Sequence, residues 1–581
     1  MKYKTPFRLE NGIVRDADGK TVKLWGVNYY APFNHNYFNI LELGKDHFAA
    51  IDEDFRHFKL MGIDFIRMHL YDREISDPYG NLVDNHQLEV LDYLIDRAEQ
   101  EGIFLMITPI VWWNTVSNQI QLDQAYAYWH IGTQQAFGFS NFFSKDSLLW
   151  DEDALACQKR YFESLFAHRN KFSGRRLDEY SNIAAIELCN EMQTPRLDML
   201  TDPETFDRNR SSAWEYSRGE QLRKLVKIWR EYKKDKTGTD REILAQFNCE
   251  HLVNYGKTMM EIVNRYFGNR TLKAMFGSYA GYLSAGDLKL FREIGVDLPT
   301  LGTYLNFDGF DSTNTDRFNH LTKAREWLEY VRDVSYGGFG KAVYEFDATG
   351  TQNGYPYAAL AAAYAKFGVQ MAAYFTYTPA AVAAWNPGWL VHYMSLEHTP
   401  RKAAAFAAAG EIFRGMSPES ELDMQEGEWS GNGFRILRDG DAVTYRDGTR
   451  FLFSNPTDAA PENPETLESV TGHGGSPVAE CSGNGCFFLK RQSAKVWTLE
   501  LMHDQAYIAD PGRGKCYRGM ANRYISCLSN PPVSLLYERK VRFRFKLGKV
   551  VSCLAEDGKN IPPETDGSLE LAAGSYTLTL E

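Results

Sequence analysis

Short apolar segments alternate with amphipathic helical patterns between residues 24 and 415, and this alternation constrains the fold more than any other feature. In the longer segments apolar residues recur at three- and four-residue spacing, for example at Ile51, Phe55 and Phe58, as in helices with one buried face. Strands and helices that alternate in this way build parallel sheets covered by helices. The pattern predicts strands at residues 24–28, 63–70, 103–110, 183–189, 272–277, 299–304, 341–344 and 371–377.

Eight strand–helix units predict a (β/α)8 barrel. The competing interpretation is a doubly wound open sheet, which usually has fewer strands and a glycine-rich phosphate-binding turn after the first one. No such turn follows Asn28. The last barrel helix is expected at residues 400–415, where Gly415 and Pro418 are stop signals.

Segments of different character flank the predicted barrel. Asn11-Gly12 and Asp18-Gly19 separate short apolar alternations near the amino terminus, which is typical of β-hairpins. After residue 420 the helical patterns disappear and period-two alternation appears, for example at 541–547. We therefore expect a hairpin cap at 1–24, a catalytic barrel at 25–416 and a β-sandwich at 420–581.

Composition narrows the classes of partner. The chain has 581 residues, enough for several cores, and a formal net charge of −12, which argues against nucleic acid as a partner. The alanine-rich stretch at 357–385 is interrupted by Lys366, Gln370 and Pro379, so no membrane span is expected. The negative net charge is more compatible with an uncharged partner than with nucleic acid.

Two predicted strands end on a glutamate: Asn190-Glu191 closes the fourth, and Tyr344-Glu345 closes the seventh. The carboxyl ends of barrel strands meet on one face, where active sites form. Two carboxyl groups about 5 to 5.5 Å apart can cleave a glycosidic bond with retention, one as acid/base and one as nucleophile. The sequence therefore indicates glycoside hydrolysis, with no cofactor and no metal.

Together with Arg67 in the second strand, Tyr304 in the sixth and Trp385 after the eighth, these residues resemble clan A glycoside hydrolases, most closely family 5. The resemblance covers roughly residues 20–415. It implies that Glu191 is the acid/base, Glu345 the nucleophile and Asn190 a donor to the sugar 2-hydroxyl. It also implies that Arg67 and Tyr304 hold Glu345 ionised, with a low pKa, and that Trp385 lies beneath the sugar.

The chain departs from the family pattern at two places. A histidine usually follows the third strand, where this chain has Trp112 and Trp113, and the usual His-x-Tyr of the sixth strand is Gly302-Thr303-Tyr304. Trp112, Trp113 and His69 are further candidates for substrate binding. Glu187, four residues before Glu191, is interpreted as structural.

Two long segments, 114–151 and 195–241, follow the third and fourth strands, and loops of this length on the catalytic face are usually functional. They contain or adjoin further aromatic residues that could close one end of a cleft: Trp129, His130, Trp150 and Trp214. We therefore expect exo action on oligosaccharides of β-linked mannose or glucose. The alternatives are an endo-acting glucanase or mannanase, a transglycosylase, and a carbohydrate-binding protein on an inactive barrel.

The remaining expectations concern cysteines and location. The eight cysteines show no CxxC spacing, and Cys481 and Cys486 could form a disulfide in an oxidising compartment. The first residues lack an apolar signal region. The protein is expected in the cytoplasm if the chain is complete, or outside it if a signal peptide has been removed. The sequence leaves the oligomeric state open.

Overall fold

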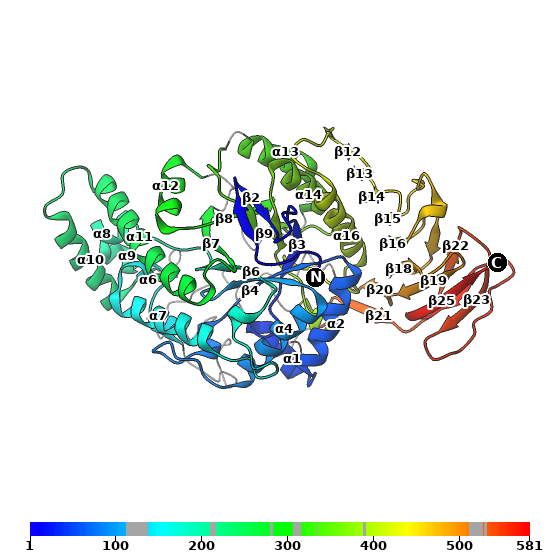
Figure 1. Cartoon of the computed structure of the whole chain (residues 1–581), viewed down its shortest axis with the longest axis horizontal. Coiled ribbons are helices and arrows are strands. Elements are labelled where there is room, and N and C mark those ends of the chain that lie inside the picture. The colour runs from blue at the N-terminus through cyan, green and yellow to red at the C-terminus, as the bar shows by residue number, and fades with distance from the viewer. Residues whose placement is uncertain are drawn as a thin grey trace.

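Eight parallel strands close into a barrel at the middle of an elongated molecule (Figure 1). The computed structural model describes residues 1–111, 138–208, 216–278, 283–305, 315–332, 334–386, 391–509, 527 and 531–581. The barrel strands are β3 (Leu24–Asn28), β4 (Phe65–His69), β5 (Phe104–Thr108), β6 (Ile183–Glu187), β7 (Leu272–Ser278), β8 (Leu298–Leu305), β9 (Ala342–Ala348) and β10 (Met371–Tyr374).

The predicted (β/α)8 barrel is confirmed, and each of the eight strands overlaps the range that the sequence predicts for it. β7, β8 and β9 extend beyond their predicted ranges, so Glu345 lies within β9 and not at its end. The longest helices that follow these strands are α2 (His47–Leu60), α4 (His86–Glu101), α7 (Glu152–Ala167), α11 (Asp240–Phe267), α12 (Ala285–Ile294), α13 (His320–Val331), α14 (Tyr355–Phe367) and α16 (Pro400–Gly415). Shorter helices are α1 (Asn34–Glu42), α3 (Asp72–Ile75), α6 (Ser147–Trp150) and α15 (Ala380–Ala383).

The interior of the barrel changes from apolar to polar along its axis. At the amino-terminal end, Leu24, Phe65 and Phe104 pack with Tyr3 and Phe7 from the chain terminus in one apolar cluster. Because successive strand residues point to opposite faces, the residues two and four positions after Phe65, Arg67 and His69, also face inward. The apolar cluster closes one end, and polar side chains collect at the other.

The hairpin of β1 (Arg8–Glu10) and β2 (Ile13–Arg15) lies at the closed end. Gln370, directly before β10, attaches it to the barrel. The Gln370 side chain accepts a hydrogen bond from the Val14 amide (2.7 Å) and donates to the carbonyl oxygens of Val14 (2.9 Å) and Val22 (3.2 Å). One buried amide thus satisfies three buried backbone groups.

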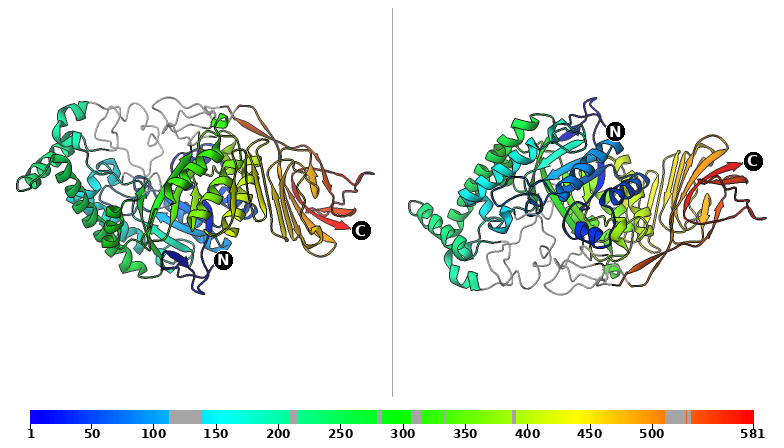
Figure 2. Two further views of the ribbon diagram at one scale, coloured as in Figure 1. Left: turned by 90° about the horizontal axis from the view of Figure 1, so that it is seen from above. Right: turned by 90° about the horizontal axis from the view of Figure 1, so that it is seen from below.

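Residues after Glu191 form a helical projection from the barrel, at the end opposite the carboxyl-terminal region (Figures 1 and 2). It comprises α8 (Leu197–Thr201), α9 (Pro203–Arg208), α10 (Gly219–Lys233) and the start of α11, around a core of its own. Trp150 is 4% exposed and belongs to that core. Trp150 therefore packs inside the projection and does not lie on a cleft surface; whether it helps to close a cleft stays a prediction.

The carboxyl-terminal region is a ten-stranded sheet with two smaller sheets. Its first half packs on α14 and α16 and continues the barrel core through Trp429, Phe434 and Ile436. Its second half faces the three-stranded sheet of β17, β22 and β24 across a separate apolar core, as in a sandwich. The strands are β11 (Leu422–Met424), β12 (Glu428–Gly431), β13 (Phe434–Leu437), β14 (Ala442–Arg446), β15 (Arg450–Phe453), β16 (Ser469–His473), β17 (Ala479–Cys481), β18 (Cys486–Arg491), β19 (Val496–Leu501), β20 (Asp504–Tyr507), β21 (Ser534–Tyr537), β22 (Val541–Phe545), β23 (Val550–Ala555), β24 (Leu569–Leu571) and β25 (Gly574–Leu580).

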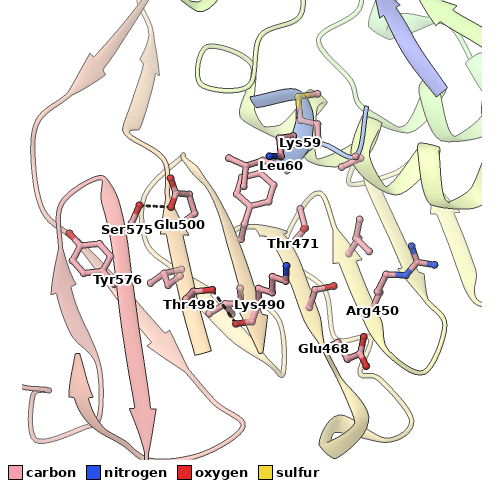
Figure 3. Close-up of a pocket in the computed structure, with 18 of the residues that line it drawn as sticks. Lys59, Leu60, Arg450, Glu468, Thr471, Lys490, Thr498, Glu500, Ser575 and Tyr576 are labelled. Atoms are coloured by element: carbon pink, nitrogen blue, oxygen red, sulfur yellow. Dashed lines mark hydrogen bonds between the residues drawn. The ribbon is translucent and has the colours of Figure 1, made fainter. Parts of the chain in front are cut away.

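A groove of about 680 Å³ runs between the end of α2 and the face of the ten-stranded sheet that is turned toward the barrel (Figure 3). Lys59 and Leu60 form its barrel wall, and β16, β18, β19 and β25 supply hydroxyl and charged side chains, among them Thr471, Lys490, Thr498 and Ser575. Glu500 accepts a hydrogen bond from Ser575 and forms an ion pair with Arg56 of α2. The groove therefore lies at the interface between the sheet and the barrel.

The seven cysteines in the described part of the chain are free thiols. Cys481 and Cys486 are buried on strands of different sheets, and the Cys486 thiol donates to the Pro400 carbonyl oxygen (3.0 Å). The disulfide that the sequence leaves open is not formed. Across the described ranges, no helix is both long enough and apolar enough to cross a bilayer.

Replacing Gln370 with leucine tests how the hairpin is attached. Gln370→Leu leaves the Val14 amide and carbonyl groups buried without their partner, at a cost of about 2–4 kcal/mol in the free energy of unfolding. A lower denaturation midpoint in urea is the expected result. Gln100→Leu, the same change on an exposed residue of α4, is the control and is expected to leave the midpoint nearly unchanged. Equal midpoints for both variants would contradict this role of Gln370.

Candidate active site

Arg67 lies at the centre of the polar end of the barrel and is fully buried. Its Nη1 donates to Glu345 Oε1 (2.9 Å) and to Asn28 Oδ1 (3.0 Å). Its Nη2 donates to Asn190 Oδ1 (2.8 Å), and Nε donates to Glu187 Oε2 (2.8 Å). One guanidinium thus connects side chains from β3, β6 and β9 and from the segment after β6.

Glu187 neutralises Arg67 and does not share the open part of the pocket. It is 0% exposed, and besides Arg67 it accepts hydrogen bonds from the hydroxyl groups of Thr108 (2.8 Å) and Thr300 (2.7 Å). Both oxygens are therefore engaged inside the barrel, as expected of a counterion for a buried guanidinium. This placement agrees with the structural role that the sequence suggests for Glu187.

Glu345 lies on β9 with both carboxyl oxygens held by donors. Oε1 accepts from Arg67, and Oε2 accepts from the Tyr304 hydroxyl on the neighbouring strand β8. The side chain is 5% exposed. Two donors on two oxygens favour the ionised form of a carboxyl group.

Glu191 lies beyond the end of β6, in a backbone conformation that side chains rarely adopt, with φ of 44°. Such left-handed conformations cost energy in residues other than glycine and concentrate at functional sites. Glu191 is partly exposed, and its Oε1 accepts a hydrogen bond from the Tyr344 hydroxyl at 2.9 Å. The structure thus brings Glu191, Glu345, Arg67, Asn190 and Tyr304 together.

Burial raises the pKa of Glu345 to about 8; Arg67 and the Tyr304 hydroxyl oppose this rise, and the nearby Glu191 carboxylate adds to it. The expectation of a low pKa for Glu345 is therefore wrong, because the burial of its carboxyl outweighs Arg67. Two carboxyl groups in one pocket hold a proton jointly. Arg67 and Tyr304 donate to both oxygens of Glu345, and these hydrogen bonds favour its ionised form against the effect of burial.

His69, at the end of β4, lies beside the acidic pair. Its Nε2 is 3.5 Å from Glu345 Oε1, and its Nδ1 is 3.0 Å from the hydroxyl oxygen of Tyr30. Burial, helped by the charges of Arg67 and Lys145, places the pKa of His69 well below its usual range. The imidazole is therefore neutral near pH 7 and able to donate or accept a single hydrogen bond on its Nε2 side.

Phe375, not singled out from the sequence, lies directly after β10 and packs beside Tyr304. Its ring centroid is 6.4 Å from that of Tyr304, 6.0 Å from that of Tyr30 and 5.2 Å from that of His392. Its place directly after the last barrel strand was the available signal. Trp385 lies ten residues further on, after α15, and is half-buried against the main core.

The predicted roles of Trp112 and Trp113 fall outside the described residues, as do Trp129, His130 and Trp214. Substrate binding by Trp385 and the role of each residue in the acidic cluster stay predictions. Sequence reasoning also missed Asn28, Thr108, Thr300, Tyr30 and Tyr344. Asn28 and Thr108 each occupy the last position of a barrel strand, which was a usable signal.

One cluster with metal-ligand chemistry exists in the described part of the chain, at Glu53, His57 and Glu397, away from the acidic pair. Its groups already have partners: Glu53 binds Arg56 and His57, and Glu397 binds His503 (2.6 Å). These contacts link α2, the segment before α16 and the segment after β19. The cluster therefore fastens the carboxyl-terminal region to the barrel.

Comparison with known proteins yields similarity in structure. Neither a protein-family model nor a curated protein sequence matches the chain. An endo-β-1,4-mannanase from Thermotoga petrophila is similar at 15% identity over 83% of this chain and 96% of that one, with a TM-score of 0.43.

A glycoside hydrolase family 5 mannosidase from Rhizomucor miehei has 11% identity over 70% and 97% of the two chains, with a TM-score of 0.42. The exo-β-1,4-mannosidase Op5Man5 from Opitutaceae bacterium strain TAV5 has 13% identity over 64% and 55%, with a TM-score of 0.38. Identities this low do not transfer an activity.

The same substitution at two neighbouring glutamates distinguishes their environments. Glu187→Gln removes the buried counterion of Arg67 and should lower the free energy of unfolding by about 3–5 kcal/mol. Glu191→Gln changes a partly exposed carboxyl and should alter it by less than about 1 kcal/mol. Urea denaturation followed by tryptophan fluorescence measures both. Similar losses in the two variants would contradict the assignment of Glu187 as counterion.

Proposed function

We propose that the protein is a retaining β-glycoside hydrolase that acts on oligosaccharides of β-linked mannose or glucose. The observation that carries this proposal is the pair of glutamates at the polar end of the barrel. Glu345 has both oxygens held by donors, and Glu191 has one donor and faces the open side. The pair has the asymmetry that the two steps of a double displacement need.

In the first step, ionised Glu345 attacks the anomeric carbon while Glu191 gives its proton to the departing oxygen. The bond from the sugar to that oxygen breaks as the bond to the Glu345 carboxylate forms. In the second step, Glu191 takes a proton from water, and the water oxygen displaces Glu345 from the anomeric carbon. The enzyme returns to its starting state with the configuration at that carbon retained.

Arg67 and Tyr304 act on Glu345 in both steps. Their hydrogen bonds orient its carboxylate before attack and stabilise it again when it leaves the sugar. Asn190 is the candidate donor to the sugar 2-hydroxyl, because its Oδ1 is taken by Arg67 and its Nδ2 group is the donor. His69, neutral and beside Glu345, is a second candidate for a sugar hydroxyl.

Exo action is the finer part of the proposal, and the helical projection supports it. Gln193, two residues after Glu191, receives a hydrogen bond from the Tyr216 hydroxyl (2.9 Å), so the projection is fixed directly beside the acidic pair. A wall at this position limits how far a sugar chain extends past the reacting bond on that side. An open endo-acting cleft needs space for sugar units on both sides of the reacting bond.

Two substitutions test the chemistry. Glu345→Gln removes the nucleophile and should abolish hydrolysis of 4-nitrophenyl β-mannoside and β-glucoside. Glu191→Ala should lower turnover about 10²–10⁴-fold, less with good leaving groups, and azide should restore part of it with a β-glycosyl azide as product. Retained activity in Glu345→Gln would contradict the roles. A wild-type protein that binds oligosaccharides yet hydrolyses no aryl glycoside would favour the carbohydrate-binding alternative.

The product pattern tests exo action. Incubation with mannohexaose, cellohexaose and the corresponding soluble polysaccharides should release single sugars or one short product from the start, with slow loss of viscosity. Chromatography of early time points measures this. Rapid loss of viscosity with products of mixed length would show endo action instead, and longer products formed in the presence of sugar acceptors would show transglycosylation.

A further inference from the structure

Tyr344 occupies a β-bulge beside Gly302. Between β8 and β9, Leu301 pairs with Val343 and Gly302 pairs with Glu345, which leaves Tyr344 as the extra residue of β9. Neighbours in a regular strand point to opposite faces, but a bulge re-aims a side chain. Tyr344 and Glu345 therefore both reach the pocket although they are adjacent in the chain.

The phenol of Tyr344 is held from several sides. The residue is 1% exposed, the Arg67 guanidinium carbon lies 4.7 Å from the ring centroid, and the Phe276 ring meets it edge-on at 5.7 Å. The hydroxyl donates to Glu191 Oε1 at 2.9 Å. Because the ring is packed in this way, the place of the hydroxyl is determined before a substrate arrives.

Gly302 supplies the space that the phenol needs. A Cβ atom at position 302 would lie 2.9 Å from the Tyr344 hydroxyl oxygen and 3.1 and 3.2 Å from Cε1 and Cζ. Such distances are shorter than ordinary van der Waals contact between heavy atoms. A side chain at position 302 would therefore displace the hydroxyl from Glu191.

Glu191 needs such an anchor, since it lies outside β6 in a left-handed backbone conformation and is partly exposed. A carboxyl on an irregular segment has more freedom than one on a strand. The hydrogen bond from Tyr344 occupies Oε1 and leaves Oε2 to carry the proton toward the departing oxygen. It also stabilises the ionised form that Glu191 adopts between the two steps.

We propose that Tyr344 is the positioning residue for Glu191, with Gly302 making room for its hydroxyl; this inference rests on the proposed function. Tyr344 selects the oxygen of Glu191 that reacts and adjusts how readily the proton leaves. Its effect is greatest where the departing group needs protonation. Tyr344 transfers no proton itself.

Tyr344→Phe tests the proposal, because the ring and its packing on Arg67 and Phe276 remain. The probes are phenyl and 2,4-dinitrophenyl β-mannosides, or the β-glucosides if the wild-type protein hydrolyses only these. For the phenyl glycoside kcat/KM should fall about 10- to 100-fold, as expected for one hydrogen bond to a charged group. For the dinitrophenyl glycoside, whose departing group needs no proton, it should change less than about 3-fold.

The pH profile supplies a readout that a merely structural role would not move. Without the Tyr344 donor the ionised form of Glu191 is less stable, so the basic limb of kcat/KM for the phenyl glycoside should move to higher pH. Equal losses on both probes with an unchanged pH profile would overturn the proposal. Full activity of Tyr344→Phe on both probes would overturn it as well.

Gly302→Ala is the second variant, and it removes none of the hydrogen-bonding groups of the site. It should reproduce the selective loss on the phenyl glycoside, and it should add little to that selectivity in the Tyr344→Phe background. A fully active Gly302→Ala variant would overturn the role of Gly302. Thermal unfolding of each variant separates loss of fold from loss of activity.

The outcomes also separate this inference from the proposed function. A wild-type protein inert on both aryl glycosides defeats the proposed function and the inference with it. An active wild-type protein whose Tyr344→Phe variant loses activity uniformly defeats the inference alone.

Discussion

The charge of Arg67 is the constraint on which the site depends. A guanidinium stays charged in proteins, and burying one is costly unless carboxylates and other acceptors surround it. Here Glu187 and Glu345 supply the negative charge, and Asn28 and Asn190 supply neutral oxygens. The same contacts that offset the cost of burial bring β3, β4, β6 and β9 to one point, with Glu345 on the open side.

This arrangement is possible because the barrel has its apolar residues at one end of its axis and its polar site residues at the other. The closed end is an apolar cluster covered by the hairpin, and Gln370 satisfies the backbone groups that this cover buries. Polar side chains are thereby confined to the carboxyl ends of the strands. The helical projection and the carboxyl-terminal sheets extend from opposite sides of the barrel (Figure 2).

Much of the fold and part of the site could be predicted because they depend on local patterns. Apolar runs that alternate with helical patterns located the eight strands, and a glutamate near the end of such a run pointed to Glu191 and Glu345. Arg67, Asn190 and Tyr304 followed from the family resemblance. The structure adds the hydrogen bonds that join Arg67 to Asn190 and Tyr304 to Glu345.

Features that depend on contacts between distant segments were not predictable. The bulge that turns Tyr344 into the pocket arises from the register of β8 against β9, and Gly302 reads as an ordinary glycine until Tyr344 is beside it. Trp150 lies in the core of the projection, and its position in the sequence does not show which segments it packs against. The elevated pKa of Glu345 follows from its burial, which a strand pattern alone does not report.

Covalent trapping tests the central claim, that Glu345, held by Arg67 and Tyr304, is the nucleophile. A 2-deoxy-2-fluoro-β-mannosyl or β-glucosyl fluoride reacts quickly to form the glycosyl-enzyme, and water then hydrolyses this intermediate slowly. Mass spectrometry of the digested protein locates the sugar. The account predicts one fluorosugar on the peptide that contains Glu345, attached to that residue. A sugar on another residue, or unlabelled protein that still turns over aryl glycosides, would contradict it.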